Sequence, residues 1–169
     1  MTAQHRRPTG YLGSERLTYV LTTARERMEM VARAHWALEM DWGEVVRIAQ
    51  FLDACRIDAG TPVFSEGDKR SYMCLLVEGE VSVRKGEQIL DRLVPGSSFG
   101  EMSLLDGSPR SATVLAESDA LVLILTRENF QRLAEECPRL VLRMVMRIAN
   151  MINDRLRETS RQLANGRTS

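Results

Sequence analysis

Residues 72–87 read YMCLLVEGEVSVRKGE, two apolar, partly β-branched runs that meet at a glycine turn, Gly79. This pattern is typical of two antiparallel strands. Similar short runs extend outward on both sides: CRIDAG (55–60), PVFSEGD (62–68), QILDRLVPG (88–96), SATVLAES (111–118) and ALVLIL (120–125). Glycines recur between them, where turns need positive φ angles: Gly60, Gly67, Gly79, Gly86, Gly96 and Gly107. The sequence therefore predicts a mainly β fold with flanking helices, in which residues 55–126 form an antiparallel β-sandwich or jelly-roll barrel.

Helical patterns flank this β region on both sides. Ser14 is predicted to cap a helix whose apolar spacing continues to Leu38, and a shorter helix is predicted from Trp42 to Ala54. After the barrel, Thr126 is predicted to cap a short helix, and a long helix follows the break at Pro138. The predicted organisation is a flexible leader (1–13), N-terminal helices (14–54), the barrel (55–126), C-terminal helices (127–164) and a tail (165–169).

Composition restricts the compartment and the partners. Lys plus Arg and Asp plus Glu both number 23, so the chain lacks the global positive field that binding to a phosphate backbone requires, and we expect no direct DNA binding. Cys55, Cys74 and Cys137 form no CxxC pair, which argues against a disulfide framework and a zinc site. The first residues lack the apolar run of a signal peptide, and no stretch has the length of a membrane span. We expect a cytoplasmic protein.

Residues for the commonest enzyme chemistries are missing from the barrel segment. The two histidines, His5 and His35, both precede it, so the histidine cluster of a metal-binding cupin enzyme is absent. The sequence contains no GxxxxGK[ST] segment and no GxGxxG after a strand. We therefore expect no enzymatic activity, no metal and no cofactor.

Residues 99–114, FGEMSLLDGSPRSATV, carry the most informative pattern in the chain. Gly100 lets an anion approach the backbone, and Arg110 offers a planar charged fork for phosphate oxygens. Glu101 would repel a phosphate, but it suits a sugar hydroxyl as a hydrogen-bond acceptor. Together these residues describe a ribose phosphate. The alternative is that Glu101 and Arg110 only pair with each other across a turn.

This segment resembles the phosphate-binding cassette of the cyclic-nucleotide-binding domain family, which includes catabolite-activator-type regulators, kinase regulatory subunits and cyclic-nucleotide-gated channels. The resemblance covers roughly residues 42–164. It implies that Glu101 holds the ribose 2′-hydroxyl and Arg110 the cyclic phosphate, with Gly100, Met102, Ser103, Ser111 and Ala112 lining the cradle. The expected ligand is cAMP, with cGMP as the alternative. The final helix usually contacts the base in this family, and Asn150 and Asn153 are its candidates here.

Apolar residues on the last helix predict a homodimer. The stripe is longer than one small barrel can cover, so a second chain is its expected cover. It consists of Leu140, Val141, Met144, Val145, Ile148, Met151, Ile152, Leu156 and Leu163. The resemblance and this stripe predict a regulatory sensor of signal transduction, in which the nucleotide rearranges the terminal helices and a downstream protein detects the change. One alternative is a dimerisation or scaffold module that has lost nucleotide binding, and another is a split regulator with a separately encoded effector domain.

Overall fold

Two antiparallel sheets form a β-sandwich in the computed structural model, which describes residues 17–166. One sheet has the strand order β1-β2-β9-β4-β7 and the other β3-β8-β5-β6. The strands are β1 (Thr18–Val20), β2 (Asp53–Ile57), β3 (Pro62–Phe64), β4 (Tyr72–Glu78), β5 (Val81–Lys85), β6 (Gln88–Leu93), β7 (Ser98–Phe99), β8 (Thr113–Ala116) and β9 (Ala120–Thr126). The predicted sandwich with flanking helices is confirmed.

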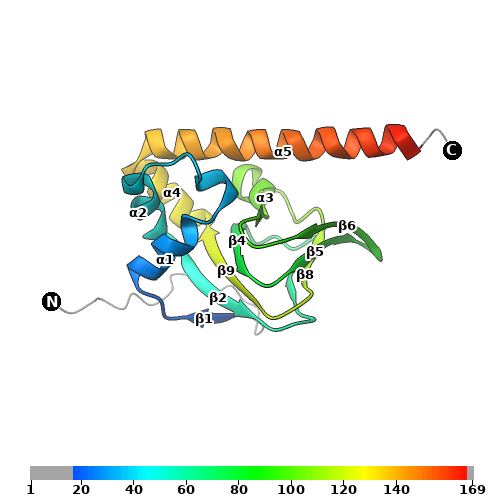
Figure 1. The fold of residues 1–169 in the computed structure, drawn as a ribbon, viewed down its shortest axis with the longest axis horizontal. Helices are drawn as coiled ribbons and strands as arrows, with labels where there is room; N and C mark the ends of the chain where they lie inside the picture. The colour runs from blue at the N-terminus through cyan, green and yellow to red at the C-terminus, as the bar shows by residue number, and fades with distance from the viewer. Residues whose placement is uncertain (1–16, 167–169) are drawn as a thin grey trace.

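The helices lie on the outer face of the five-stranded sheet, and α5 crosses the molecule along one edge and extends past the strands (Figure 1). The helical elements are α1 (Ala24–Val31), the 3-10 helix η1 (His35–Ala37), α2 (Trp42–Ala49), α3 (Glu101–Asp106), α4 (Arg127–Glu136) and α5 (Pro138–Gly166). No helix in the described part of the chain has the length and apolar character needed to cross a membrane.

Strand β4 contributes to two separate hydrophobic cores, because successive side chains point to opposite faces of a sheet. Met73, Leu75 and Val77 pack against the helices. Tyr72, Cys74 and Leu76 pack between the two sheets. Strand β9, its neighbour, alternates in the same way between the two cores. Burial on both faces explains why these two strands have continuous apolar sequences.

The prediction of one helix through Leu38 is wrong. Residues Thr18–Val20 form β1, which pairs with β2, and the chain becomes helical only after Thr23. Thr23 and Glu26 form a capping box, which fixes the start of α1. The β-prone sequence Thr-Tyr-Val and this cap outweigh the helical apolar spacing. The predicted cap Ser14 and the predicted leader, 1–13, lie outside the described residues.

Other predicted boundaries can be compared directly with the structure. Helix α2 ends at Ala49 instead of Ala54, because the chain enters β2 at Asp53. The Thr126 cap is confirmed by its hydrogen bond from the Asn129 backbone N–H, and the break at Pro138 is confirmed as the start of α5. Helix α5 continues to Gly166, into the predicted tail, of which residues 167–169 lie outside the described residues.

The three cysteines differ in burial, and their reactivity toward a thiol reagent can test this difference. Cys55 and Cys74 are buried and Cys137 is half-buried, none of them in a disulfide. Burial raises the pKa of Cys55 and raises that of Cys74 to about 12, so both stay protonated near neutral pH. We expect Ellman's reagent to modify Cys137 alone in the native protein at pH 8 and all three thiols after denaturation. Rapid native modification of a Cys137→Ser variant would contradict this.

Candidate functional site

Gly100 sets the geometry of the segment that was predicted to bind a phosphate. It adopts a left-handed conformation, with φ of 78°, at the N-cap of α3. A Cβ atom here would lie 2.7 Å from Arg110 Nη1 and 3.0 Å from the Tyr72 carbonyl oxygen. Only glycine therefore allows both this turn and the close approach of Arg110. Directly after Gly100 the chain forms the short helix α3.

The Arg110 side chain lies inside the domain, with 4% of its surface exposed. Nη1 donates to the Gly100 carbonyl at 2.9 Å and to Ser103 Oγ at 2.5 Å, and Nη2 donates to the Tyr72 carbonyl at 2.7 Å. The guanidinium also lies over the rings of Phe64 and Tyr72. Burial lowers the pKa of Arg110, but an arginine stays charged in proteins. A buried cation held by neutral acceptors suits an anionic ligand.

Glu101 is almost fully buried and is held by the last helix. Its Oε1 accepts a hydrogen bond from Arg155 Nη1 at 2.9 Å, which forms an ion pair. Arg155 Nη2 also donates to the Ser98 carbonyl oxygen at 2.8 Å. The alternative of a direct Glu101–Arg110 pair is wrong, because Glu101 pairs with Arg155 and Arg110 bonds to carbonyl and hydroxyl oxygens.

A cavity of about 270 Å³ lies between α3, the loop after it and the four-stranded sheet. All seven residues predicted to bind the ligand line it: Gly100, Glu101, Met102, Ser103, Arg110, Ser111 and Ala112. Phe64, Val83 and Val114 give it an apolar wall. The cavity therefore combines two carboxylates, Glu101 and Asp106, two guanidinium groups, Arg110 and Arg155, and an apolar surface. A nucleotide with a sugar hydroxyl and a phosphate requires groups of these kinds.

The two asparagines predicted to contact a base lie elsewhere. Asn150 and Asn153 are exposed, and neither lines this cavity. Asn150 lines a separate groove between η1 and α5. A base contact by either residue stays a prediction. Within the described residues, no group of three or more His, Cys, Asp and Glu side chains is placed to hold a metal ion.

Residues 54–137 match the family model described as "Cyclic nucleotide-binding domain". The chain belongs to this family. The match contains the four-stranded sheet, the cassette and most of the five-stranded sheet, with α4 as its last element. The resemblance inferred from residues 99–114 is confirmed.

Known cyclic nucleotide-binding domains resemble the chain in sequence and fold. It is 38% identical over 92 residues to a cAMP-dependent protein kinase regulatory subunit of Aspergillus niger, covering 53% of this chain and 22% of that protein. The structure of a cyclic nucleotide-binding domain from Methylobacillus flagellatus KT superposes with a TM-score of 0.78, at 23% identity and 89% coverage of both chains.

A bacterial regulator extends the comparison. The Thermus thermophilus catabolite activator protein superposes with a TM-score of 0.66, at 32% identity, over 76% of this chain and 61% of that chain. The chain spans 22% of the length of the Aspergillus niger protein and 49% of the length of a cyclic AMP receptor protein of Thermus thermophilus. The activities of those longer proteins are therefore not assigned to this chain.

Arg155 is the residue of this cyclic nucleotide-binding domain that sequence reasoning missed. It was not among the predicted site residues, but its guanidinium bonds to the carboxylate in the cavity. Its spacing held a signal, since Arg155 follows Ile148 by seven residues and Met151 by four. An arginine on the buried face of an amphipathic helix needs a partner in the domain.

Proposed function

We propose that the chain is a regulatory sensor that binds cAMP in the 270 Å³ cavity. One observation carries the proposal. Among the described residues, three buried side-chain polar atoms have no hydrogen-bond partner, and two of them, Glu101 Oε2 and Arg110 Nε, belong to residues of this cavity. An unpaired buried acceptor and an unpaired buried donor are costly unless a ligand satisfies them. A ribose hydroxyl for Glu101 and a phosphate oxygen for Arg110 would do so.

The choice of cAMP over cGMP rests on the relatives. The Aspergillus niger relative is named as cAMP-dependent, and the Thermus thermophilus protein as a catabolite activator. Ser111 lines the cavity beside Arg110. Its hydroxyl can donate or accept a hydrogen bond, so it is compatible with both adenine and guanine. cGMP is therefore the comparison ligand for every titration.

Calorimetric titration of the purified chain with cAMP, cGMP and linear 5′-AMP tests the proposal. We expect saturable binding of cAMP, weaker binding of cGMP and none of 5′-AMP at the same concentration. A Glu101→Ala variant should bind more weakly, whereas an Arg157→Ala variant, changed at an exposed position of α5, should match the wild type. If a folded wild-type protein binds neither cyclic nucleotide, the proposal is wrong.

We also propose that binding is read out through the terminal helices and not through catalysis. Helix α5 packs on the domain through Leu140, Val141, Met144 and Ile148, and farther along it reaches the cavity through Arg155. A ligand that prefers one position of α5 would shift the population of that position in proportion to the difference in affinity. The downstream partner and the cytoplasmic location stay predictions.

The outward stripe of α5 supports a homodimer. Of the predicted stripe, Leu140, Val141, Met144 and Ile148 are buried against the chain's own domain, and Val145 and Ile152 pack partly against the same core. Two residues outside the predicted stripe, Leu142 and Ala149, complete a seven-residue repeat with Val145, Ile152 and Leu156. Leu142 and Leu156 are 64% and 63% exposed. This spacing is the a/d pattern of a coiled coil, so a second copy of α5 is the proposed cover.

A Leu156→Glu substitution tests this dimer. Burying a leucine contributes about 1.5–3 kcal/mol, so the charge is expected to raise the dimer dissociation constant by at least about tenfold. Light scattering after size exclusion measures the mass over a range of concentrations. Leu90→Glu, at an exposed leucine of β6, is the control and should leave the mass unchanged. A wild type that stays monomeric at high concentration contradicts the dimer.

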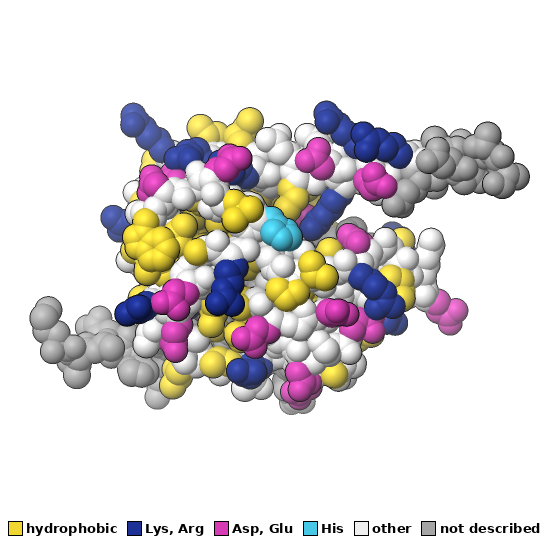
Figure 2. Space-filling model, viewed as in Figure 1, with side chains coloured by type: hydrophobic (Ala, Val, Ile, Leu, Met, Phe, Trp, Pro, Cys, Tyr) yellow, Lys and Arg dark blue, Asp and Glu magenta, His cyan; other side chains and the backbone are white. Residues whose placement is uncertain are grey.

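The second candidate function is a dimerisation or scaffold module without a ligand. The same stripe on α5 favours it, because a coiled-coil seam does not need the cavity. The titration above separates the two candidates. Direct DNA binding stays disfavoured, since acidic side chains are interspersed with the arginines along α5 on the face drawn in Figure 2.

A further inference from the structure

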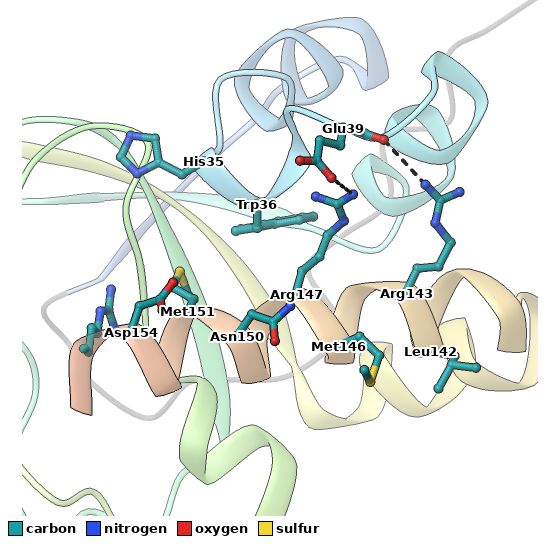
Figure 3. A pocket seen from close by; sticks show the side chains of 11 residues that line it. His35, Trp36, Glu39, Leu142, Arg143, Met146, Arg147, Asn150, Met151 and Asp154 are labelled. Carbon is teal, nitrogen blue, oxygen red and sulfur yellow. Dashed lines mark hydrogen bonds and ion pairs between the residues drawn. The ribbon is translucent and has the colours of Figure 1, made fainter. Parts of the chain in front are cut away.

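A groove of about 730 Å³ lies between η1 and α5, on the helical side of the molecule (Figure 3). Among the described residues, Arg155 is the one that lines both this groove and the nucleotide cavity. On the α5 side the lining extends from Leu142 to Arg155. At about 1.5 Å per residue, this wall is about 20 Å long, or about three and a half helical turns. The length suits a helical segment of another protein better than a small molecule.

Apolar side chains line the groove and remain partly exposed. Leu142 and Met146, on α5, are 64% and 57% exposed, and Met151 is half-buried. The ring of Trp36 is buried, and its indole N–H already donates to Ser98 Oγ at 2.6 Å. Exposed apolar side chains grouped in a hollow are typical of binding surfaces, and methionines adapt easily to the shape of an amphipathic helix. We therefore expect an occupant with an apolar stripe.

The wall formed by α5 is positively charged. This helix, Pro138–Gly166, contains six arginines and two acidic residues, although the whole chain carries no net charge. Arg139, Arg143 and Arg147 follow one another at four-residue intervals, so they share one face of the helix. Arg143 and Arg147 line the groove. The charge favours an acidic occupant over a basic one.

The bonds of Arg147 show which chemical group the groove binds. Its Nη2 donates to Glu39 Oε2 at 2.5 Å, and Arg143 Nη2 donates to the Glu39 carbonyl oxygen at 3.5 Å, so both side chains reach across from α5 (Figure 3). The Glu39 side chain is 77% exposed. An exposed ion pair of this kind contributes little, so a partner's carboxylate can join or replace Glu39 at Arg147. Asp154, the other carboxylate of the lining, pairs with Arg157 at 3.9 Å.

Two other occupants fit the groove less well. A second copy of this chain is proposed above to pair through a repeat that includes Val145, Ile152 and Leu156, and these three side chains do not line the groove. An anionic lipid surface would match the charge of α5. Such a surface is flat, however, whereas the apolar side chains here line a hollow.

We propose that the groove between η1 and α5 is a docking site for an amphipathic helix of a partner protein. The apolar stripe of that helix packs on Leu142 and Met146, and its Asp or Glu side chains bind Arg143 and Arg147. This inference goes beyond the proposed nucleotide binding and does not rest on it, because these four residues do not line the nucleotide cavity.

Selection from a display library of helical peptides of about 16 residues, against the immobilised chain without nucleotide, tests the docking site. We expect the enriched peptides to have an apolar stripe and a negative net charge. Fluorescence anisotropy of one labelled peptide then measures its affinity for variants. Met146→Glu and Arg147→Glu are each expected to weaken binding at least about tenfold, because each places a negative charge against an acidic peptide. Arg161→Glu, beyond the groove on the same helix, is the control and should bind like the wild type.

Thermal unfolding first shows that each variant is folded, and Met146→Glu, at an exposed position, should melt close to the wild type. Three results would overturn the docking site: no enriched peptide, enriched peptides without negative charge, or equal affinity of the peptide for the wild type and Met146→Glu. Cosedimentation with vesicles of phosphatidylcholine and phosphatidylglycerol that the peptide prevents would also overturn it, in favour of a membrane contact.

Nucleotide titration of the same protein separates this inference from the proposed function. A wild type that binds the peptide but no cyclic nucleotide contradicts the proposed function and leaves the docking site standing. A wild type that binds cAMP but selects no acidic peptide contradicts the docking site alone.

Discussion

An Arg110→Ala variant is expected to bind cAMP at least about 100-fold more weakly than the wild type, the largest effect of any single substitution in the cavity. The reason is twofold. The guanidinium is the buried cation that faces the ligand's phosphate, and it also holds the cassette together through the carbonyl oxygens of Tyr72 and Gly100. Removing it takes a donor from both acceptors. The Gly100 carbonyl oxygen keeps the hydrogen bond from Ser103 Oγ, so the cost of about 1–3 kcal/mol falls mainly on the Tyr72 carbonyl oxygen. The variant should therefore lose stability as well as affinity.

Two measurements separate these effects for Arg110. Urea denaturation gives the change in the free energy of unfolding, and calorimetric titration is made under conditions where the variant is folded. Arg110→Lys retains the charge but not the fork, so we expect it to recover part of the stability and little of the affinity. An Arg110→Ala protein that is folded and binds cAMP as tightly as the wild type would contradict the assigned role.

Gly100→Ala is expected to destabilise the domain by at least about 2 kcal/mol, because two costs add. A left-handed conformation costs a residue with a Cβ about 1–2 kcal/mol. The new methyl group would also meet Arg110 Nη1 at 2.7 Å and the Tyr72 carbonyl oxygen at 3.0 Å. Because it displaces Arg110, the substitution should also weaken cAMP binding.

Gly86→Ala is the matched control for Gly100→Ala. Gly86 also has a positive φ, 57°, but a Cβ atom there meets nothing within 4 Å. Gly86→Ala should therefore lose only the stability that the left-handed backbone conformation costs, and it should leave the cAMP affinity unchanged. Thermal and urea denaturation of both variants measure the difference. Equal losses of stability at the two positions would show that the cassette accommodates the methyl group and that Arg110 is not tightly placed.

The strands and the cassette were predictable from the sequence because their signals are local. Glycines separate short apolar runs, and residues 99–114 form one continuous pattern whose members line one cavity. The N-terminal error has a local cause too, since the apolar spacing of residues 17–38 fits a helix. What decides β1 is its pairing with β2, some 35 residues away along the chain, which no local pattern contains.

The partner of Arg155 and the burial of part of the α5 stripe could not be predicted from helical spacing alone, for a different reason. Whether a side chain on a long helix faces its own domain or solvent depends on how the helix is rotated against its neighbours, which for α5 are chiefly α4 and η1. Met144 and Ile148 fix that rotation by their burial. This rotation turns Arg155 toward Glu101 and leaves Leu142 and Leu156 facing outward.

The double burial of β4 and β9 has a thermodynamic consequence. Since each of these strands forms a wall of both cores, neither core can lose its packing while the other keeps its own. The sandwich and its helical layer are therefore expected to melt together, as one cooperative transition. A nucleotide bound on the sandwich side would raise the melting temperature of the helical side too, because binding to the native state stabilises the whole cooperative unit.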